Sequence, residues 1–230
     1  IITNSKWMKN FFNNSPLTKK VKTQTIYNPI EGNIWIRKKS KYAKKKLGLD
    51  IRKKYILVGA HGGFKNYRKG LDLFIESLEY LQHLNREFEI IILGNDKNKT
   101  EIISGFKFNF RKFTSSKYDQ VLYHSAANLI ASPSRGESIP QFIVETLLCK
   151  NPVVSFDIGG MNEIIKHKFN GYLAKPFDKK DFANGMLHCL NNLKTKNIKI
   201  FRKKLLKMFD KKINSDCYSK TIKNFLLDHK

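Results

Sequence analysis

The sequence predicts an α/β protein built on a doubly wound parallel β-sheet and closed by a helical tail. Short, continuous apolar runs recur along the chain, as in strands that are buried on both faces of a sheet. Segments with helical periodicity separate these runs, and strands that alternate with helices form parallel sheets. With 41% hydrophobic residues among 230, the chain can bury a core of this kind.

The first part of the chain is expected to contain only short elements. Residues 1–6 read like the end of a strand that runs into a helix N-cap, so we expect a fragment of a longer protein. One of the polar residues at 3–5 would cap a short helix through Phe12, and residues 21–28 alternate like a strand. The charges of residues 37–54 are almost all basic, and we interpret this segment as a solvated helix and turn.

The central part of the chain carries the strands and helices of the predicted sheet. Apolar runs predict strands at 55–59, 88–94, 128–132, 152–156 and 171–173, with a weaker strand at 106–110. Helical periodicity between them predicts helices at 71–81, 118–126 and 141–149.

The tail from Asp181 onward is predicted to be helical and carries two apolar stripes. The stripes consist of Ile198, Phe201, Leu205 and Met208, and of Tyr218, Ile222 and Phe225. Amphipathic helices of this kind usually pack on a core. Because basic residues flank both stripes, a helix that lies on a membrane surface is the alternative.

The charge of the chain narrows the possible partners. With 44 basic and 19 acidic residues the net charge is +25, which suits nucleic acid, an anionic membrane leaflet or a phosphate-rich small ligand. A compositional bias toward lysine on solvated faces would produce the same number. The only candidate for a single-strand groove, residues 106–111, alternates like a strand instead.

Localisation and metal content are inferred from what the sequence lacks. It has no apolar run of about 18 residues and no signal-peptide pattern, so we expect a cytoplasmic protein, with peripheral attachment to the inner face of the membrane as an option. The cysteines Cys149, Cys189 and Cys217 have no paired spacing, and no two histidines have metal-ligand spacing. We therefore expect no disulfide framework, no metal and no cofactor.

In a doubly wound sheet the ligand lies beyond the carboxyl ends of the strands, so the loops after 59, 94, 132 and 156 are candidates. In the first loop, Gly62 and Gly63 let the backbone approach a ligand, and Arg68 and Lys69 precede a helix start. This is a phosphate cradle in outline, although it matches neither the P-loop nor the GxGxxG fingerprint. A surface loop with solvated cations is the alternative.

The loop after residue 132 leads into a helix that bears two polar side chains. Ser138 and Gln141 have capping-box spacing and predict the helix start, with Pro140 tolerated in the first turn. Gln141 and Glu145 would project from one side of this helix. Glu137 lies just before it, where a carboxylate could bind sugar hydroxyls, although either glutamate could be a solvated charge.

The loop after residue 156 carries Gly159 and Gly160 before a probable helix start. A plain strand-to-helix turn explains it equally well. Among the six histidines, only His61 falls in a candidate loop.

Several of these residues stand together in a recognisable order. The motifs are Arg68-Lys69-Gly70, Pro133-Ser134-Arg135-Gly136-Glu137 followed by Glu145, Asn151-Pro152-Val153-Val154, Gly159-Gly160 before Glu163, and Asn170-Gly171-Tyr172-Leu173 with Pro176 and Asp178. Over residues 4–190 the pattern resembles the retaining glycosyltransferases of family 4, and residues 218–227 resemble the closing helix of that family.

The resemblance implies a fold and a division of the chain. Members of the family have two Rossmann-like domains, the GT-B fold, and hold the nucleotide-sugar mainly in the second. This chain resembles only that C-terminal half. Residues 1–30 would be a remnant of the acceptor domain and linker, 31–190 the donor-binding domain and 191–230 the C-terminal helices. Without the acceptor domain and its catalytic histidine, the chain would be inactive alone.

The resemblance also implies roles for residues. Lys69, with Arg68, would neutralise the donor diphosphate, Glu137 would contact the transferred sugar and Glu145 would hold the ribose; Glu137 and Lys69 would thus be the catalytic residues. The amides of Ser138, Ile139, Pro140, Gln141 and Phe142 would line the sugar and phosphate, beside the glycines Gly62 and Gly63. The leaving diphosphate would be stabilised electrostatically and without a metal.

The sequence departs from the family at two positions. Ala60 stands where many members have an arginine, and Pro140 replaces a common glycine. In having a proline at this position, the sequence resembles those members of the family that act on bacterial surface polysaccharides.

The function implied is transfer of a sugar from a nucleoside diphosphate to a glycan or lipid-linked acceptor, with an anionic membrane as an optional partner and no nucleic acid. The alternatives are a basic module that binds nucleic acid or anionic membrane, and a sugar-nucleotide epimerase. The nucleobase, sugar, acceptor, linkage and oligomeric state stay open.

Overall fold

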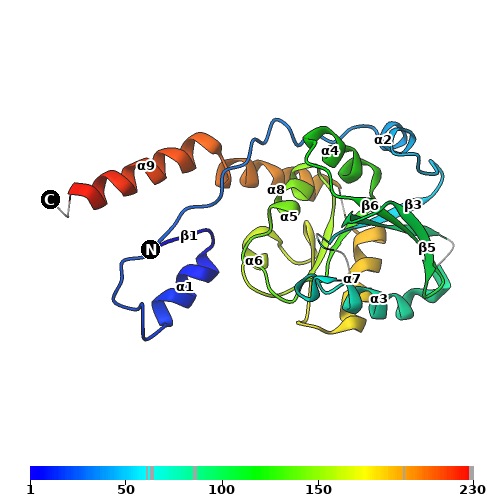
Figure 1. Cartoon of the computed structure of the whole chain (residues 1–230), viewed down its shortest axis with the longest axis horizontal. Coiled ribbons are helices and arrows are strands. Elements are labelled where there is room, and N and C mark those ends of the chain that lie inside the picture. Colours follow the sequence, from blue (N-terminus) through cyan, green and yellow to red (C-terminus); the bar gives the residue numbers. More distant parts are fainter. Residues whose placement is uncertain (61, 63–64, 85–86, 194, 228–230) are drawn as a thin grey trace.

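The computed structural model describes residues 1–60, 62, 65–84, 87–193 and 195–227 (Figure 1). Its central element, within these residues, is a seven-stranded sheet with the order β5-β6-β4-β3-β7-β8-β9. The strands are β3 (Lys54–Gly59), β4 (Phe88–Asn95), β5 (Lys99–Ile103), β6 (Phe106–Lys112), β7 (Leu129–Ser132), β8 (Val153–Phe156) and β9 (Gly171–Ala174). The two most central of the predicted strands, at 55–59 and 128–132, differ from β3 and β7 by one residue.

The connections make this sheet doubly wound. The chain leaves β3 toward β4 and β6 on one side, and then returns across β3 to form β7, β8 and β9 on the other. All these neighbours are parallel. The winding reverses between β3 and β7, and a crevice opens at the carboxyl ends of strands where this happens. The predicted fold class is confirmed.

One edge of the sheet departs from the prediction of a wholly parallel arrangement. β5, which the sequence analysis missed, pairs with β6 in the antiparallel sense. The two strands are joined by Ser104 and Gly105, whose φ angles are 47° and 76°. Two consecutive residues with positive φ form the tight reversal of a hairpin, and so short a connection permits only antiparallel pairing.

Helices cover both faces of the sheet (Figure 1). α2 (Ser40–Lys46), α4 (Lys117–Ala126), α5 (Gln141–Leu148) and α8 (Thr195–Met208) pack on one face, together with α6 (Met161–Ile164). α3 (Leu71–Leu78) and α7 (Lys179–Asn191) pack on the other. In β3, Leu57 faces the first layer while Ile56 and Val58 face the second, as the two-residue period of a strand requires.

The two apolar stripes of the tail differ in burial. Ile198 and Leu205 of α8 are buried in the core, as predicted. Ile222 and Phe225 of α9 (Lys211–Leu227) remain 53% and 59% exposed, so the prediction that this second stripe packs on the core is wrong. α9 projects away from the sheet (Figure 1) and contacts the N-terminal segment, where Thr221 donates to Gln24 Oε1 at 3.0 Å and Gln24 donates to Cys217 Sγ at 3.3 Å. No helix within the described residues is long and apolar enough to cross a bilayer.

The N-terminal segment forms β1 (Ile2–Thr3), α1 (Lys6–Asn14) and β2 (Gln24–Thr25). Ser5 is the N-cap of α1, and its hydroxyl accepts the N–H of Met8 at 3.0 Å. The strand predicted at 21–28 shrinks to β2, because β1 offers it only two residues to pair with. The division of the chain at residues 30 and 190 stays a prediction.

The basic segment 37–54 contains α2, as predicted, but it is not fully solvated. Lys44 is 7% exposed; its Nζ donates to the carbonyl of Lys53 at 2.7 Å and lies over the Tyr55 ring. Arg37 donates to the carbonyls of Lys150 and Ala127. These two cations satisfy carbonyl oxygens at the ends of other elements, so the solvated interpretation is wrong for them.

Candidate active site

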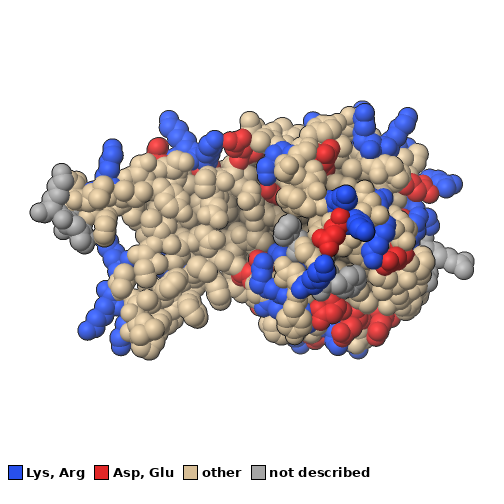
Figure 2. Space-filling model, in the orientation of Figure 1, with Lys and Arg blue, Asp and Glu red and all other residues tan. Residues whose placement is uncertain are grey.

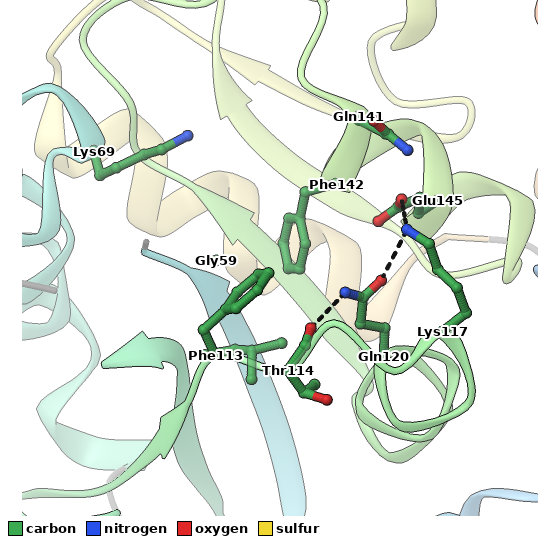
Figure 3. A pocket seen from close by; sticks show the side chains of 10 residues that line it. Gly59, Lys69, Phe113, Thr114, Lys117, Gln120, Gln141, Phe142 and Glu145 are labelled. Carbon is green, nitrogen blue, oxygen red and sulfur yellow. Dashed lines mark hydrogen bonds and ion pairs between the residues drawn. The ribbon is translucent and has the colours of Figure 1, made fainter. Parts of the chain in front are cut away.

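A cavity of about 270 Å³ opens at the carboxyl ends of β3, β4 and β6, where α4 and α5 begin. It is lined by Gly59, Lys69, Leu93, Phe113, Thr114, Lys117, Gln120, Gln141, Phe142 and Glu145 (Figure 3). Four of these residues, Lys69, Gln141, Phe142 and Glu145, are site residues that the sequence analysis predicted.

The wall of the cavity depends on a glycine at the end of β3. A Cβ atom at Gly59 would lie 2.7 Å from Cε1 of the Phe142 ring. Real Cβ atoms do not approach a ring this closely, so only glycine allows α5 to bring Phe142 against the strand end. The β3 terminus and the start of α5 thereby meet at the point where the winding of the sheet reverses.

Two cations converge on the predicted sugar-contacting carboxylate beside the cavity. Lys69 Nζ lies 2.7 Å from Glu137 Oε1, and Arg68 Nη1 lies 2.9 Å from the same oxygen. The side chains of Lys69 and Glu137 are 18% and 11% exposed, so solvent screens their attraction only partly. The arrangement is a place where two positive side chains hold one anionic group.

Glu145 is the buried acid of the cavity, with 6% exposure. Burial raises its pKa from the usual 4.5 to about 7, while the charge of Lys117 and a hydrogen bond from Gln141 oppose this rise. Lys117 Nζ lies 3.9 Å from Glu145 Oε1. On the inner side, His124 Nε2 lies 4.0 Å from Glu145 Oε2, and complete burial lowers the pKa of this histidine to about 3, so it is neutral.

The start of α5 differs from the predicted capping box. Pro140, not Ser138, is the N-cap residue, and it makes no side-chain cap. The Ser138 hydroxyl instead lies 2.7 Å from Asn4 Oδ1 and 2.8 Å from Ser5 Oγ, so it ties the N-terminal segment to this loop. The first-turn amides of a helix lack intrahelical acceptors, and the first-turn residues Gln141 and Phe142 line the cavity. Ile139 packs against the core cluster rather than lining the cavity.

The loop with Gly159 and Gly160 supports the loop before α5 and does not line the cavity. Gly160 donates its N–H to the carbonyl of Ser138 at 2.9 Å. At Gly159, where φ is 56°, a Cβ atom would collide with the carbonyl oxygen of Glu137. The two glycines thus allow a close approach of backbone to backbone.

The first glycine loop is placed only in part. Gly62 donates its N–H to the carbonyl of Gly94 at 3.1 Å and does not line the cavity. Gly63 and His61 lie outside the described residues, so their predicted roles stay predictions.

The sequence analysis missed the wall formed by Phe113, Thr114, Lys117 and Gln120. These residues follow β6, the weaker of the predicted strands, and the loop after it was not among the candidates. The rule that selected the other loops would have selected this one, because β6 is parallel to β4 and ends at the same edge of the sheet.

Comparison with known proteins decides the family. Residues 55–192 match the family described as glycosyl transferases group 1. The chain belongs to this family. The match covers all the strands of the central sheet except the first residue of β3, together with α3 through α7.

Relatives of this group 1 glycosyltransferase are distant in sequence and close in fold. It is 26% identical over 153 residues to the D-inositol 3-phosphate glycosyltransferase of Xylanimonas cellulosilytica, covering 61% of this chain and 35% of that protein. The sucrose-phosphate synthase of Thermosynechococcus elongatus has a TM-score of 0.81 at 17% identity, over 99% of this chain and 58% of that one. Anabaena HepE in complex with UDP and glucose has a TM-score of 0.75 at 19% identity, over 96% and 62%.

These matches show the fold of the chain and the part of its relatives that it spans. Its fold is that of the C-terminal domain of GT-B glycosyltransferases, with the accompanying helices. The chain spans about half or less of the length of the curated relatives it matches, from 35% to 51%.

Proposed function

We propose that this chain is the donor-binding part of a retaining family-4 glycosyltransferase, which transfers a sugar from a nucleoside diphosphate to a glycan or lipid-linked acceptor. One observation carries the proposal: a single cavity has the Lys69 ammonium on one wall and the buried Glu145 carboxylate on another (Figure 3). A nucleoside diphosphate has an anionic group and a pair of ribose hydroxyls, and these two walls match them. The structures of Anabaena HepE in complex with UDP-glucose and with UDP, which share this fold, support the choice of ligand.

In the proposed reaction, Lys69 and Arg68 bind the diphosphate. When the sugar departs, negative charge grows on the leaving diphosphate, and fixed cations stabilise it without reorganising. Glu137, adjacent to both cations, is placed to accept hydrogen bonds from hydroxyls of the transferred sugar. We propose that these two cations stabilise the leaving diphosphate without a metal ion.

Glu145 and two aromatic rings would hold the nucleoside. An ionised carboxylate has two acceptor oxygens, so it can accept a hydrogen bond from each of the two ribose hydroxyls. The rings of Phe113 and Phe142 line the same cavity, and Phe142 lies between Lys69 and Glu145 in the view of Figure 3. Flat apolar faces of this kind suit a nucleobase.

The acceptor and the biological role are proposed from coarser observations. The net charge of +25 suits an acceptor that is anionic or embedded in an anionic leaflet. Together with Pro140 at the start of α5, this favours surface polysaccharide synthesis with peripheral attachment to a membrane.

Titration calorimetry with UDP, GDP and ADP and their glucose conjugates tests the proposed donor site. Glu145→Gln and Lys69→Ala should each weaken both the free diphosphate and its conjugate about ten- to hundredfold, since hydrogen bonds to charged groups contribute about 1.5 to 3 kcal/mol. Lys180→Met, a change of the same charge on the exposed face of α7, serves as the control and should bind like the parent. Binding that none of the site variants weakens, or a far tighter complex with single-stranded nucleic acid, would overturn the proposed site.

A further inference from the structure

Lys117 is the cation beside Glu145 in the cavity, and no motif marks it. Its ammonium lies 3.9 Å from Glu145 Oε1, 3.5 Å from Gln120 Oε1 and 5.3 Å from the centre of the Trp35 ring (Figure 3). Its side chain is 48% exposed, whereas that of Glu145 is 7% exposed. The lysine therefore brings a charge to the acid from the solvent side without itself being buried.

The first turn of α4 fixes the position of this lysine. Ser116 caps the helix, and its hydroxyl accepts the N–H of Asp119 at 3.2 Å. Gln120, three residues after Lys117 and on the same face, donates from Nε2 to the carbonyl of Thr114 at 2.7 Å. Trp35, which is 2% exposed, offers its ring face to the ammonium. Cap, amide and ring together hold the lysine against the cavity.

Among the described residues, the other groups near Glu145 supply no positive charge that could replace that of Lys117. His124, which lies on α4 like Lys117, is neutral because burial lowers its pKa to about 3. Cys149, one turn after Glu145, is a neutral thiol because burial raises its pKa to about 12. The charges of Arg37 and Arg202 oppose this rise in the pKa of the thiol. Gln141 is an uncharged donor to Glu145. Across the cavity, the Lys69 ammonium is engaged by Glu137.

Charge and burial therefore oppose each other at Glu145. Burial favours the protonated acid, which would donate a hydrogen bond of its own and accept fewer. A cation within about 4 to 6 Å favours the ionised form. Among the described residues, Lys117 is the group that supplies this charge at Glu145.

We propose that Lys117 is a positioning residue of the donor site, which keeps the Glu145 carboxylate ionised and turned toward the ribose hydroxyls. The inference rests on the proposed function of Glu145 and adds a residue to it. Lys117 acts through Glu145 and needs no contact of its own with the nucleotide. Its removal should therefore change the pH at which the nucleotide binds and leave the affinity at high pH nearly intact.

The test is the affinity for UDP, measured by titration calorimetry from pH 6.5 to 9 for Lys117→Met, Lys117→Arg and the control Lys180→Met. Because the terminal phosphate of UDP gains a proton at a pH of about 6, each affinity is divided by that of the control variant at the same pH. Lys117→Met should bind about three- to tenfold more weakly near pH 7 and within about twofold of the control at pH 9, since a shift of one pKa unit is a tenfold change. Lys117→Arg, which keeps the charge, should follow the control.

A ligand-free measurement separates this inference from the proposed function. The carboxyl carbon of Glu145, labelled with ¹³C and assigned by its loss in Glu145→Gln, is titrated by NMR in the parent and in Lys117→Met. Its midpoint should move to higher pH in Lys117→Met. If the titration midpoint of Glu145 is the same in Lys117→Met and the parent, or if the loss of UDP affinity is equal at every pH, the proposed role of Lys117 is wrong. The proposed donor site would not be affected by either result. A moved midpoint with no UDP binding to any chain would overturn the role of the pair in donor binding, together with the proposed function. Lys117→Gln repeats both arms should the methionine variant fold poorly.

Discussion

Glu137 lies between the two cations that we assign to the diphosphate, at 2.7 Å from Lys69 and 2.9 Å from Arg68. A diphosphate that reaches these cations must compete with a carboxylate that already holds them. The sequence suggested that Glu137 concerns the transferred sugar alone. The ion pairs add a second role, because release from Lys69 and Arg68 would free the carboxylate for the sugar at the moment when the diphosphate takes its place.

This arrangement predicts opposite effects on free UDP for the two partners. Glu137→Gln should tighten UDP by about threefold to tenfold, because a partly buried ion pair worth roughly 1 kcal/mol no longer has to be broken. Lys69→Ala should weaken it. Titration calorimetry with UDP measures both effects. Glu101→Gln is the control, since Glu101 is paired with Lys99 at 2.7 Å on the far edge strand. Weaker UDP binding by Glu137→Gln would show that the carboxylate supports the diphosphate instead of competing with it.

At the scale of elements, the site is a set of loops that end neighbouring parallel strands. β7 and β8 are adjacent and parallel, so the loops that follow them leave the same edge of the sheet and pack on each other. The contact runs through backbone, since Gly160 donates to the carbonyl of Ser138 and Gly159 passes against Glu137. The glycine pair Gly159 and Gly160 therefore supports the loop that carries Glu137 and Ser138, whereas the sequence indicated only a turn there.

Gly159→Ala tests this support. Alanine at a φ of 56° is strained by about 1 to 3 kcal/mol, and its Cβ would collide with the carbonyl of Glu137. We expect a lower free energy of unfolding in urea and weaker binding of UDP-glucose. Gly136→Ala is the matched control in the loop itself, because its Cβ would meet nothing within 4 Å. Equal stability and affinity in the two variants would contradict the assignment.

Over the whole molecule, charge and exposed apolar surface are distributed unevenly. Lysines and arginines lie over much of the sheet-bearing part and at the far end near α9, and a largely uncharged region separates them on the face shown in Figure 2. α9 carries both kinds of surface, since Ile222, Phe225 and Leu226 are more than half exposed and Lys220 and Lys223 lie on the same helix. Exposed apolar and basic side chains on one helix are the groups that an anionic membrane interface would contact.

We therefore expect salt-sensitive binding to anionic vesicles. Basic residues near such a surface contribute about 1 kcal/mol each, so sedimentation with phosphatidylserine vesicles should exceed that with neutral vesicles at low salt and fall as salt rises. Reversing Lys220 and Lys223 to glutamate should reduce binding more than reversing Lys45 and Lys46 on α2, at the opposite end of the molecule (Figure 1). Equal binding to both kinds of vesicle would mean that the excess of lysine is compositional.

The sequence by itself determined the class of fold and most of the secondary structure. β3, β4, β7 and β8 are continuous apolar runs, and such a run is decided by local composition because both faces of the strand are buried. β5 escaped notice because it is an edge strand whose residues are mostly exposed, so burial leaves little pattern in it. The catalytic candidates Lys69 and Glu137 were found because they lie in loops that follow strand ends, and the donor-binding candidate Glu145 was found because it lies on the helix after Glu137, at the spacing of the motif.

Only the tertiary structure decided which of these residues meet. That Lys69 pairs with Glu137, that Ser138 contacts Asn4 instead of capping α5, and that Lys117 faces Glu145 depend on segments far apart in the chain. Such contacts leave no periodicity in the sequence, because they arise where separate strands of one sheet end at the same edge. The same holds for α9: its apolar stripe has the pattern of a buried helix, but the assembled fold leaves Ile222 and Phe225 more than half exposed.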